Sequence, residues 1–346
     1  MPTGQALRGR APLLFLRNAA LAAMFVYGYV YTYVKLGNPY FGRNDFFRYM
    51  EMIGRPFDFA ATRAPFVLRQ IPSLLATVFY RLGAHYDGDT VTTLVGLDDD
   101  TRRRFMALVL SNAVAVCLCL ATLATYLRCK TKYPDDLTVS FALFGAFSAW
   151  FWFASVPFAP VTVGWGWLVT ALLAVAFWER SLVLTGIAAA LAVFTRETAL
   201  VFALAWFASY ALLDRKRAHR LPAAAAIIFS AGCLYLVLRV TLSTGYEHQI
   251  SPPHIFAALR SPTLAPGFLF QSVLSQALFV LLWLAIAIRD WRLGVSLGCG
   301  MAAILVAGLG AAISEFAMVT GESLPAFVLA FFLTRAAGRD TAMSPP

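Results

Sequence analysis

Charged residues are scarce in this chain of 346 residues. Lys, Arg, Asp and Glu make up 13% of the sequence, about half the share of an ordinary soluble domain, whereas hydrophobic residues make up 60% and the mean hydropathy is +0.70. Too little polar surface remains to cover a water-soluble globule. The same composition excludes a disordered chain, a coiled coil and a nucleic-acid-binding module with a broad basic face. We therefore expect an integral membrane protein that binds no nucleic acid.

The chain has only five cysteines, and this odd number excludes a framework in which every cysteine is paired in a disulfide. All five lie within or beside apolar runs, as expected of small packing residues: Cys117, Cys119, Cys129, Cys233 and Cys299. Their spacing matches no zinc site. We expect no cofactor and assign no metal ligand, with a divalent metal at the acidic cluster Asp98 to Asp100 as the alternative. A cleavable signal is also lacking, because the first apolar run, 13–34, is long enough to span a membrane and shows no small-residue cleavage pattern. We expect it to remain as an anchor.

Long apolar runs predict seven membrane spans and a shorter last helix at 324–337. The spans are expected at 13–35, 105–128, 137–156, 161–178, 221–240, 268–288 and 294–313. The run 181–213 is too long for one ordinary span and carries Arg196 and Glu197 in its middle. It forms either one tilted helix with an ion pair in hydrocarbon, which is costly, or two short helices that turn at Arg196.

The distribution of Lys and Arg favours two short helices. With a turn at Arg196, nearly all basic residues of the short loops fall on one side, and only Arg196, Arg239 and Arg260 remain opposite. The positive-inside rule then places both termini in the cytoplasm, and a bacterial inner membrane suits this pattern. The predicted fold is all-α, a polytopic bundle of about 9–11 helices, in a single domain at 1–338 with a short tail at 339–346.

The first extracytoplasmic loop is predicted at 36–104, far longer than most loops, and so is expected to be functional. Within it, the mostly apolar segment 65–82 should form a helix lying at the outer interface. Its apolar side should face the membrane and its polar groups should face water.

Twelve of the 18 acidic residues fall on the predicted outer side, where two candidate residues follow the first span. Asp45 is placed to accept a proton from an acceptor hydroxyl, and Arg48, about one helical turn later, to hold a phosphate. The alternative is structural, with Asp45 as a helix N-cap and Arg48 in a solvated ladder of charges with Glu51.

Arginines supply the next candidates. Arg69 in the interfacial helix can snorkel and bind a lipid phosphate, or contact ordinary anionic headgroups. In Thr195-Arg196-Glu197-Thr198, Arg196 is predicted to bind an anion at the start of the returning helix, with Glu197 orienting Arg196 or binding an acceptor. Alternatively, Thr195 caps that helix and Glu197 complements its dipole.

The remaining candidates lie in later outer segments. His248 could neutralise a phosphate leaving group, although a plain polar loop fits its surroundings equally well. Glu322, in the turn before the last helix, either reaches the cavity or caps that helix. The acidic run Asp98-Asp99-Asp100 before the second long span is expected to complement the helix dipole, and the three arginines that follow it to snorkel to headgroups.

Together these features resemble the GT-C-fold integral-membrane glycosyltransferases. The resemblance rests on Asp45 after the first span, on Pro-Phe-x-x-Arg ending at Arg69, on the Thr-Arg-Glu-Thr break at 195–198, and on the acidic turn from Glu322 to Pro325. It implies transfer of a sugar from a polyprenyl-phosphate donor to an unidentified glycan, lipid or protein acceptor at the outer face. It also implies that Asp45 acts as the base, with basic outer residues holding the phosphate.

This chain departs from the family pattern in having Asn44 before Asp45 rather than two neighbouring acids, and in lacking an added soluble domain. Two other functions fit the same sequence. A transporter or flippase also needs polar residues over a helical bundle, although such proteins commonly carry repeated halves, which are not visible here. A non-catalytic subunit of a membrane assembly is the third hypothesis.

Overall fold

The computed structural model describes residues 11–36, 43–62, 66–85, 98–131, 163–214, 219–242, 266–307 and 321–342. Within these ranges the protein is all-helical, as predicted. The helices are α2 (Ala11–Leu36), α3 (Arg43–Met52), the 3-10 helix η1 (Phe66–Leu68), α4 (Gln70–Arg81), α5 (Asp99–Lys130), α7 (Val163–Glu179), α8 (Leu182–Val193), α9 (Thr198–Leu213), α10 (Leu221–Leu242), α12 (Pro266–Arg289), α13 (Trp291–Ala307) and α15 (Leu324–Ala342). The predicted span at 137–156 lies outside them.

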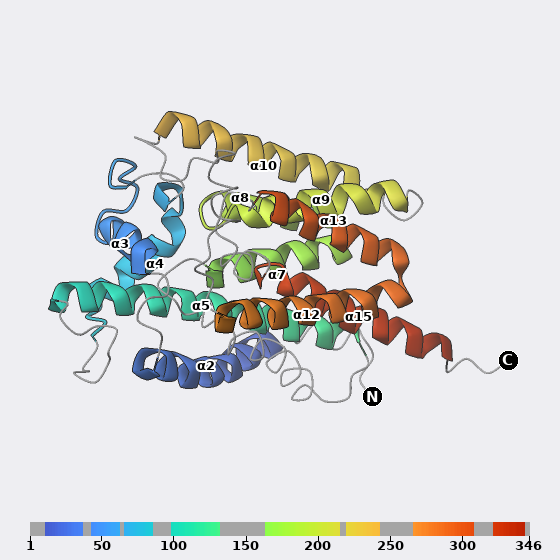
Figure 1. Cartoon of the computed structure of the whole chain (residues 1–346), viewed down its shortest axis with the longest axis horizontal. Helices are drawn as coiled ribbons and strands as arrows, with labels where there is room; N and C mark the ends of the chain where they lie inside the picture. The colour runs from blue at the N-terminus through green and yellow to red at the C-terminus, as the bar shows by residue number, and fades with distance from the viewer. Residues whose placement is uncertain are drawn as a thin grey trace.

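The long helices lie side by side in a layered bundle, and the short helices α3 and α4 gather at one end of it (Figure 1). Helix α5 forms the centre of the packing, because it contacts α2, α4 and α7. Helix α9 packs against α13 and α10, and α15 packs against α12 and α7. The apolar core of this bundle includes Trp167, Trp206 and Phe207, each at most 1% exposed.

Two ion pairs show which helix ends lie next to each other. Lys130 at the end of α5 pairs with Glu179 at the end of α7 (2.6 Å), and Arg292 in α13 pairs with Asp214, directly after α9 (3.3 Å). One end of the bundle, here called the basic end, therefore collects Arg128, Lys130, Arg180, Arg220, Arg289 and Arg292. Basic residues that the sequence assigns to one side of a membrane thus share one end of the bundle.

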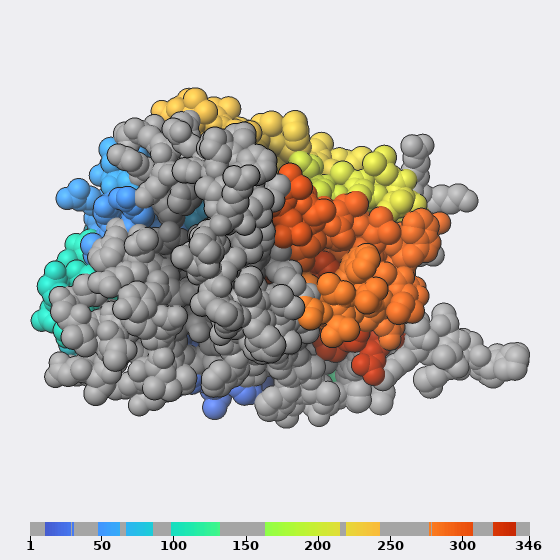
Figure 2. Space-filling view, viewed as in Figure 1, coloured from blue at the N-terminus to red at the C-terminus, as the bar shows by residue number. Residues whose placement is uncertain are grey.

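The outer surface of the bundle is apolar. Three helices in the described ranges, α2, α5 and α10, are long and apolar enough to cross a membrane. Figure 2 shows α9, α10, α12 and α13 forming one side of the surface, and large apolar side chains are exposed along α10, α12 and α13: Phe229, Leu236, Val240, Leu281, Ile288 and Val306. Apolar exposure on this scale is typical of a surface that another apolar phase covers.

Helix α4 is amphipathic in the opposite sense to a helix of a soluble protein. Its buried side carries Gln70, Ser73 and Thr77, whereas Leu74 and Val78 are exposed. Apolar side chains of α4 are thus exposed, whereas its polar groups point into the protein rather than into water, contrary to the prediction. They are satisfied there, because Thr77 donates to the Ser73 carbonyl (2.8 Å) and Gln70 donates to the Val67 carbonyl (2.5 Å).

Candidate functional site

The site begins at the break between α8 and α9. Helix α8 ends at Val193 and α9 begins at Thr198, so the apolar run 181–213 forms two short helices, as predicted. The turn closes on itself through backbone bonds from Arg196 N to Ala192 O (2.9 Å) and from Leu200 N to Glu197 O (3.0 Å). Two adjacent charged residues are thereby placed at the end of the bundle opposite the basic end.

Arg69 approaches this turn from the segment between η1 and α4. Its Nε and Nη2 donate to the two carboxylate oxygens of Glu197 at 3.2 and 2.8 Å, and its Nη1 donates to the Tyr49 hydroxyl of α3 at 2.6 Å. Arg69 is 5% exposed. A bidentate ion pair of this kind fixes the orientation of both groups as well as their separation. Arg69 is therefore held inside the protein and does not snorkel to a membrane surface.

A second ion pair lies beside the first. Arg196 Nε contacts Glu322 Oε1 at 2.6 Å, with both side chains at most 5% exposed, and the Thr198 hydroxyl donates to the other Glu322 oxygen. Glu322 lies in the turn before α15, where the indole of Trp167 in α7 donates to the carbonyl oxygen of Gly321 (2.9 Å). We call Arg69, Glu197, Arg196 and Glu322 the charge cluster.

The charge cluster is buried yet electrically balanced. Two guanidinium groups face two carboxylates, and each Arg pairs with a Glu from a segment more than 120 residues away in the sequence. Isolated charges at such depth are expensive, whereas paired and hydrogen-bonded charges are tolerated. Buried ion pairs add little net stability relative to apolar residues, so the charge cluster is a candidate for a functional site.

A glycine leaves space for the second ion pair. Gly166 of α7 faces it so closely that an added Cβ would lie 3.2 Å from Arg196 Cγ and 3.2 Å from Glu322 Cδ. A Cβ at Gly186 of α8, by contrast, would meet nothing within 4 Å. The cluster therefore depends on the absence of a side chain at position 166.

Alanine substitutions at Gly166 and Gly186 should have opposite effects on stability. Gly166→Ala is expected to destabilise the protein by about 1–3 kcal/mol through crowding, whereas Gly186→Ala should stabilise it by roughly 0.5–1 kcal/mol, because Ala favours helix. Thermal unfolding of the purified protein in detergent measures both effects. Equal stabilisation by the two substitutions would mean that the cluster does not fill the space beside α7.

The other predicted residues lie in different surroundings. Asp45 and Arg48 belong to α3, and position 45 lies one helical turn before Tyr49. Arg48 contacts Glu51 at 3.8 Å with both side chains partly exposed, which fits the predicted ladder of charges. His248 and the side chain of Asp45 lie outside the described residues. Of the side chains that the structure describes, no three His, Cys, Asp or Glu residues gather as a metal site.

Two tyrosines of the site were not predicted. Tyr49 is fully buried. Tyr235 of α10 is 5% exposed and lies near Glu197 and Arg69, but its buried hydroxyl has no hydrogen-bond partner among the described residues. The available sequence signal for Tyr49 was its position one turn after Asp45 in a short polar helix. Tyr235 lies in a uniformly apolar helix, where nothing in the local pattern distinguishes it from a packing residue.

Comparison with known proteins gives no match: no protein-family model, curated protein or solved structure matches this chain. Its function is therefore inferred from the chemistry and placement of the site residues, because a helical bundle alone is compatible with many functions.

Proposed function

We propose that this protein is an integral-membrane glycosyltransferase that transfers a sugar from a polyprenyl-phosphate donor to an acceptor at the outer face of the membrane. The apolar outer surface and the three helices of membrane-spanning length support insertion into a bilayer. The basic end supports an orientation with that end in the cytoplasm, which puts both termini inside, and a bacterial inner membrane fits this arrangement. The charge cluster then faces the extracytoplasmic side.

One observation carries the proposal. Arg69 and Arg196 lie in one buried cluster, and Tyr49 ties α3, the helix that bears Asp45, directly to Arg69 (2.6 Å). The helix that bears Asp45 and two cationic side chains thus lie at the same end of the bundle, although they come from segments that are distant in sequence. Deprotonation of an acceptor and stabilisation of a departing phosphate require groups of these two kinds.

The proposed reaction is a single displacement. Asp45 accepts the proton of the acceptor hydroxyl while the oxygen of that hydroxyl attacks the anomeric carbon of the donor sugar. The bond between that carbon and the phosphate oxygen breaks, and the electron pair leaves with the polyprenyl phosphate. Arg69 and Arg196 stabilise the negative charge that develops on the phosphate, and their carboxylate partners keep both guanidinium groups oriented before the donor binds. Inversion at the anomeric carbon follows.

The substrates are therefore a membrane lipid carrying the sugar and an acceptor that is a glycan, a lipid or a protein of the cell envelope. No metal enters the proposed chemistry, because a sugar phosphate is already an activated donor. His248 remains a candidate for stabilising the leaving group, and Arg48 for contacting the donor.

The main rivals are a transporter or flippase and a non-catalytic assembly subunit. Purified protein in proteoliposomes can be supplied with polyprenyl-phosphate hexose or pentose labelled in the sugar, together with membranes from cells that lack the protein as the acceptor source. We expect label to leave the polyprenyl lipid and to appear covalently in acceptor material. Label that crosses the bilayer chemically unchanged would favour a flippase, and no conversion with either donor would favour an assembly subunit.

A further inference from the structure

Helix α3 depends on its neighbours for its position. It has ten residues, a length at which an isolated helix is marginal in water, and its sequence is largely polar. Tyr49, Met52 and Ile53, at or beside its last turn, are at most 1% exposed, so the C-terminal end of α3 is anchored in the protein. Directly after it, Gly54 adopts a positive φ of 89°, the left-handed conformation that commonly ends a helix.

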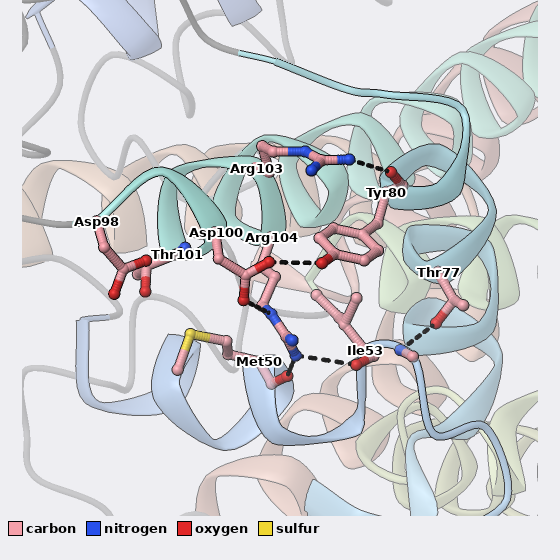
Figure 3. Close-up of polar contacts among 10 residues, drawn as sticks. Met50, Ile53, Thr77, Tyr80, Asp98, Asp100, Thr101, Arg103 and Arg104 are labelled. Atoms are coloured by element: carbon pink, nitrogen blue, oxygen red, sulfur yellow. Dashed lines mark hydrogen bonds and ion pairs between the residues drawn. The ribbon is translucent and has the colours of Figure 1, made fainter.

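An arginine of α5 binds the carbonyl groups at that end. Arg104 Nη1 donates to the carbonyl oxygens of Met50 and Ile53, at 3.0 Å each, and the Met50 oxygen also accepts from Ile53 N at 3.2 Å. These groups lie at the end of the helix, where carbonyls lack their usual helical partners. Arg104 is itself fixed: its Nε contacts Asp100 Oδ2 at 2.7 Å, and its guanidinium lies 5.2 Å from the centre of the Tyr80 ring. Figure 3 shows it extending from α5 to the end of α3 between these partners.

The surrounding contacts hold Arg104 in this orientation. The Tyr80 hydroxyl donates to the other oxygen of Asp100 at 2.5 Å, which ties α4 to the first turn of α5. That first turn begins at Asp98, whose carboxylate accepts from Thr101 N at 2.7 Å. The Thr77 hydroxyl of α4 also accepts from Gly54 N at 3.0 Å, so the chain leaving α3 is attached to the same two helices (Figure 3).

We propose that Arg104 is a positioning residue that sets the placement of α3, and with it Asp45, relative to the charge cluster. This inference rests on the proposed glycosyltransferase function. With a rise of about 1.5 Å per residue, position 45 lies roughly 7 Å along the helix from Met50, so a tilt of about 8° at the anchored end displaces position 45 by about 1 Å. A displacement of that size lowers the rate of a positioned reaction by up to about 100-fold.

Arg103 is the matched control for Arg104. It is the preceding residue of α5, and its guanidinium lies 4.9 Å from the centre of the same Tyr80 ring. Its Nη2 donates to the carbonyl oxygen of Tyr80 in α4 (3.3 Å), and no described hydrogen bond joins it to α3. Arg103→Met therefore removes a neighbouring arginine of the same helical turn while leaving the anchor of α3 in place.

The test combines kinetics with hydrogen exchange on the full-length protein in proteoliposomes. Arg104→Met is expected to lower kcat for transfer from a polyprenyl-phosphate sugar by about 10- to 100-fold and to leave the donor KM within about two-fold. Arg104→Lys keeps a cation with several donors and should recover part of the lost kcat. Backbone amides of 45–53 should exchange at least about tenfold faster in Arg104→Met, and Arg103→Met should change neither quantity by more than about two-fold.

The inference fails if Arg104→Met retains the wild-type kcat and α3 exchange rate, or if Arg103→Met matches its losses. Should Arg104→Met not fold, Arg104→Gln, whose side chain is shorter and uncharged, decides the question, because wild-type kcat and α3 exchange in that variant would contradict the positioning role. Absence of transfer by the wild-type protein would count against the proposed function, whereas α3 exchange in the variants would still report on the anchor.

Discussion

Asp45→Asn is expected to lower sugar transfer by roughly 10²- to 10⁴-fold, the usual range for loss of a positioned general base. The amide keeps the size of the side chain but cannot accept the proton of the acceptor hydroxyl. Position 45 lies one turn before Tyr49, whose hydroxyl binds Arg69, so the substitution acts at the end of the bundle that holds the charge cluster. Expression and donor binding should remain close to wild type.

The measurement is the rate of transfer of labelled sugar at saturating donor, together with donor affinity. Glu51→Gln is the matched control, because Glu51 lies in the same helix, is exposed, and contacts only the partly exposed Arg48 among the described ion pairs. It should retain transfer within about two-fold, since an exposed ion pair contributes little. Full turnover by Asp45→Asn would remove this residue from the mechanism.

The second large effect concerns the Arg69–Glu197 pair. Arg69→Met should destabilise the protein by roughly 3–5 kcal/mol, because it leaves a buried carboxylate without its main partner. The double variant Arg69→Met with Glu197→Leu should regain most of that stability, since apolar residues of similar size can replace a buried ion pair. Both variants should lack transfer, because the guanidinium that stabilises the departing phosphate is absent from each.

Equilibrium unfolding of the three proteins in detergent, followed by the transfer assay, separates stability from activity. For the unfolding measurement alone, Arg48→Met is the matched control: its pair with Glu51 spans 3.8 Å with side chains 36% and 41% exposed, so its loss should cost at most about 1 kcal/mol. A double variant that regained stability and also transferred sugar would show that the cluster has only a structural role.

Much of the architecture was predictable from composition and charge. The break at Arg196 followed from the cost of two adjacent charged residues in an apolar run, and the structure confirms it as the turn between α8 and α9. The role of the acidic run before α5 is also confirmed, because Asp98 caps the helix and Asp99 and Asp100 occupy its first turn. Both predictions depend only on local chemistry, which the sequence displays directly.

The choice of partners was not predictable in the same way. Glu197 was expected to orient its neighbour Arg196 or to bind an acceptor. The two neighbours do not pair with each other, because successive side chains of a tight turn diverge, and they pair with Arg69 and Glu322. Acceptor binding by Glu197 stays a prediction. Arg69 was expected to snorkel, and Arg104 to reach headgroups, yet both end on protein acceptors. Pairings across more than 120 residues depend on helix packing, which no sequence period encodes.

The shortness of α8 and α9 determines the depth of the charge cluster. With 12 and 16 residues, these helices extend about 18 and 24 Å at a rise of roughly 1.5 Å per residue, less than the ~30 Å hydrocarbon thickness of a bilayer. The turn between them is then recessed several ångströms below the lipid headgroups when their basic ends lie at the opposite interface. A water-soluble nucleotide sugar would have to lose its hydration to descend that far, whereas a donor tethered to a lipid tail can enter sideways from the leaflet. Selection for lipid-linked donors would thus follow from the length of two helices.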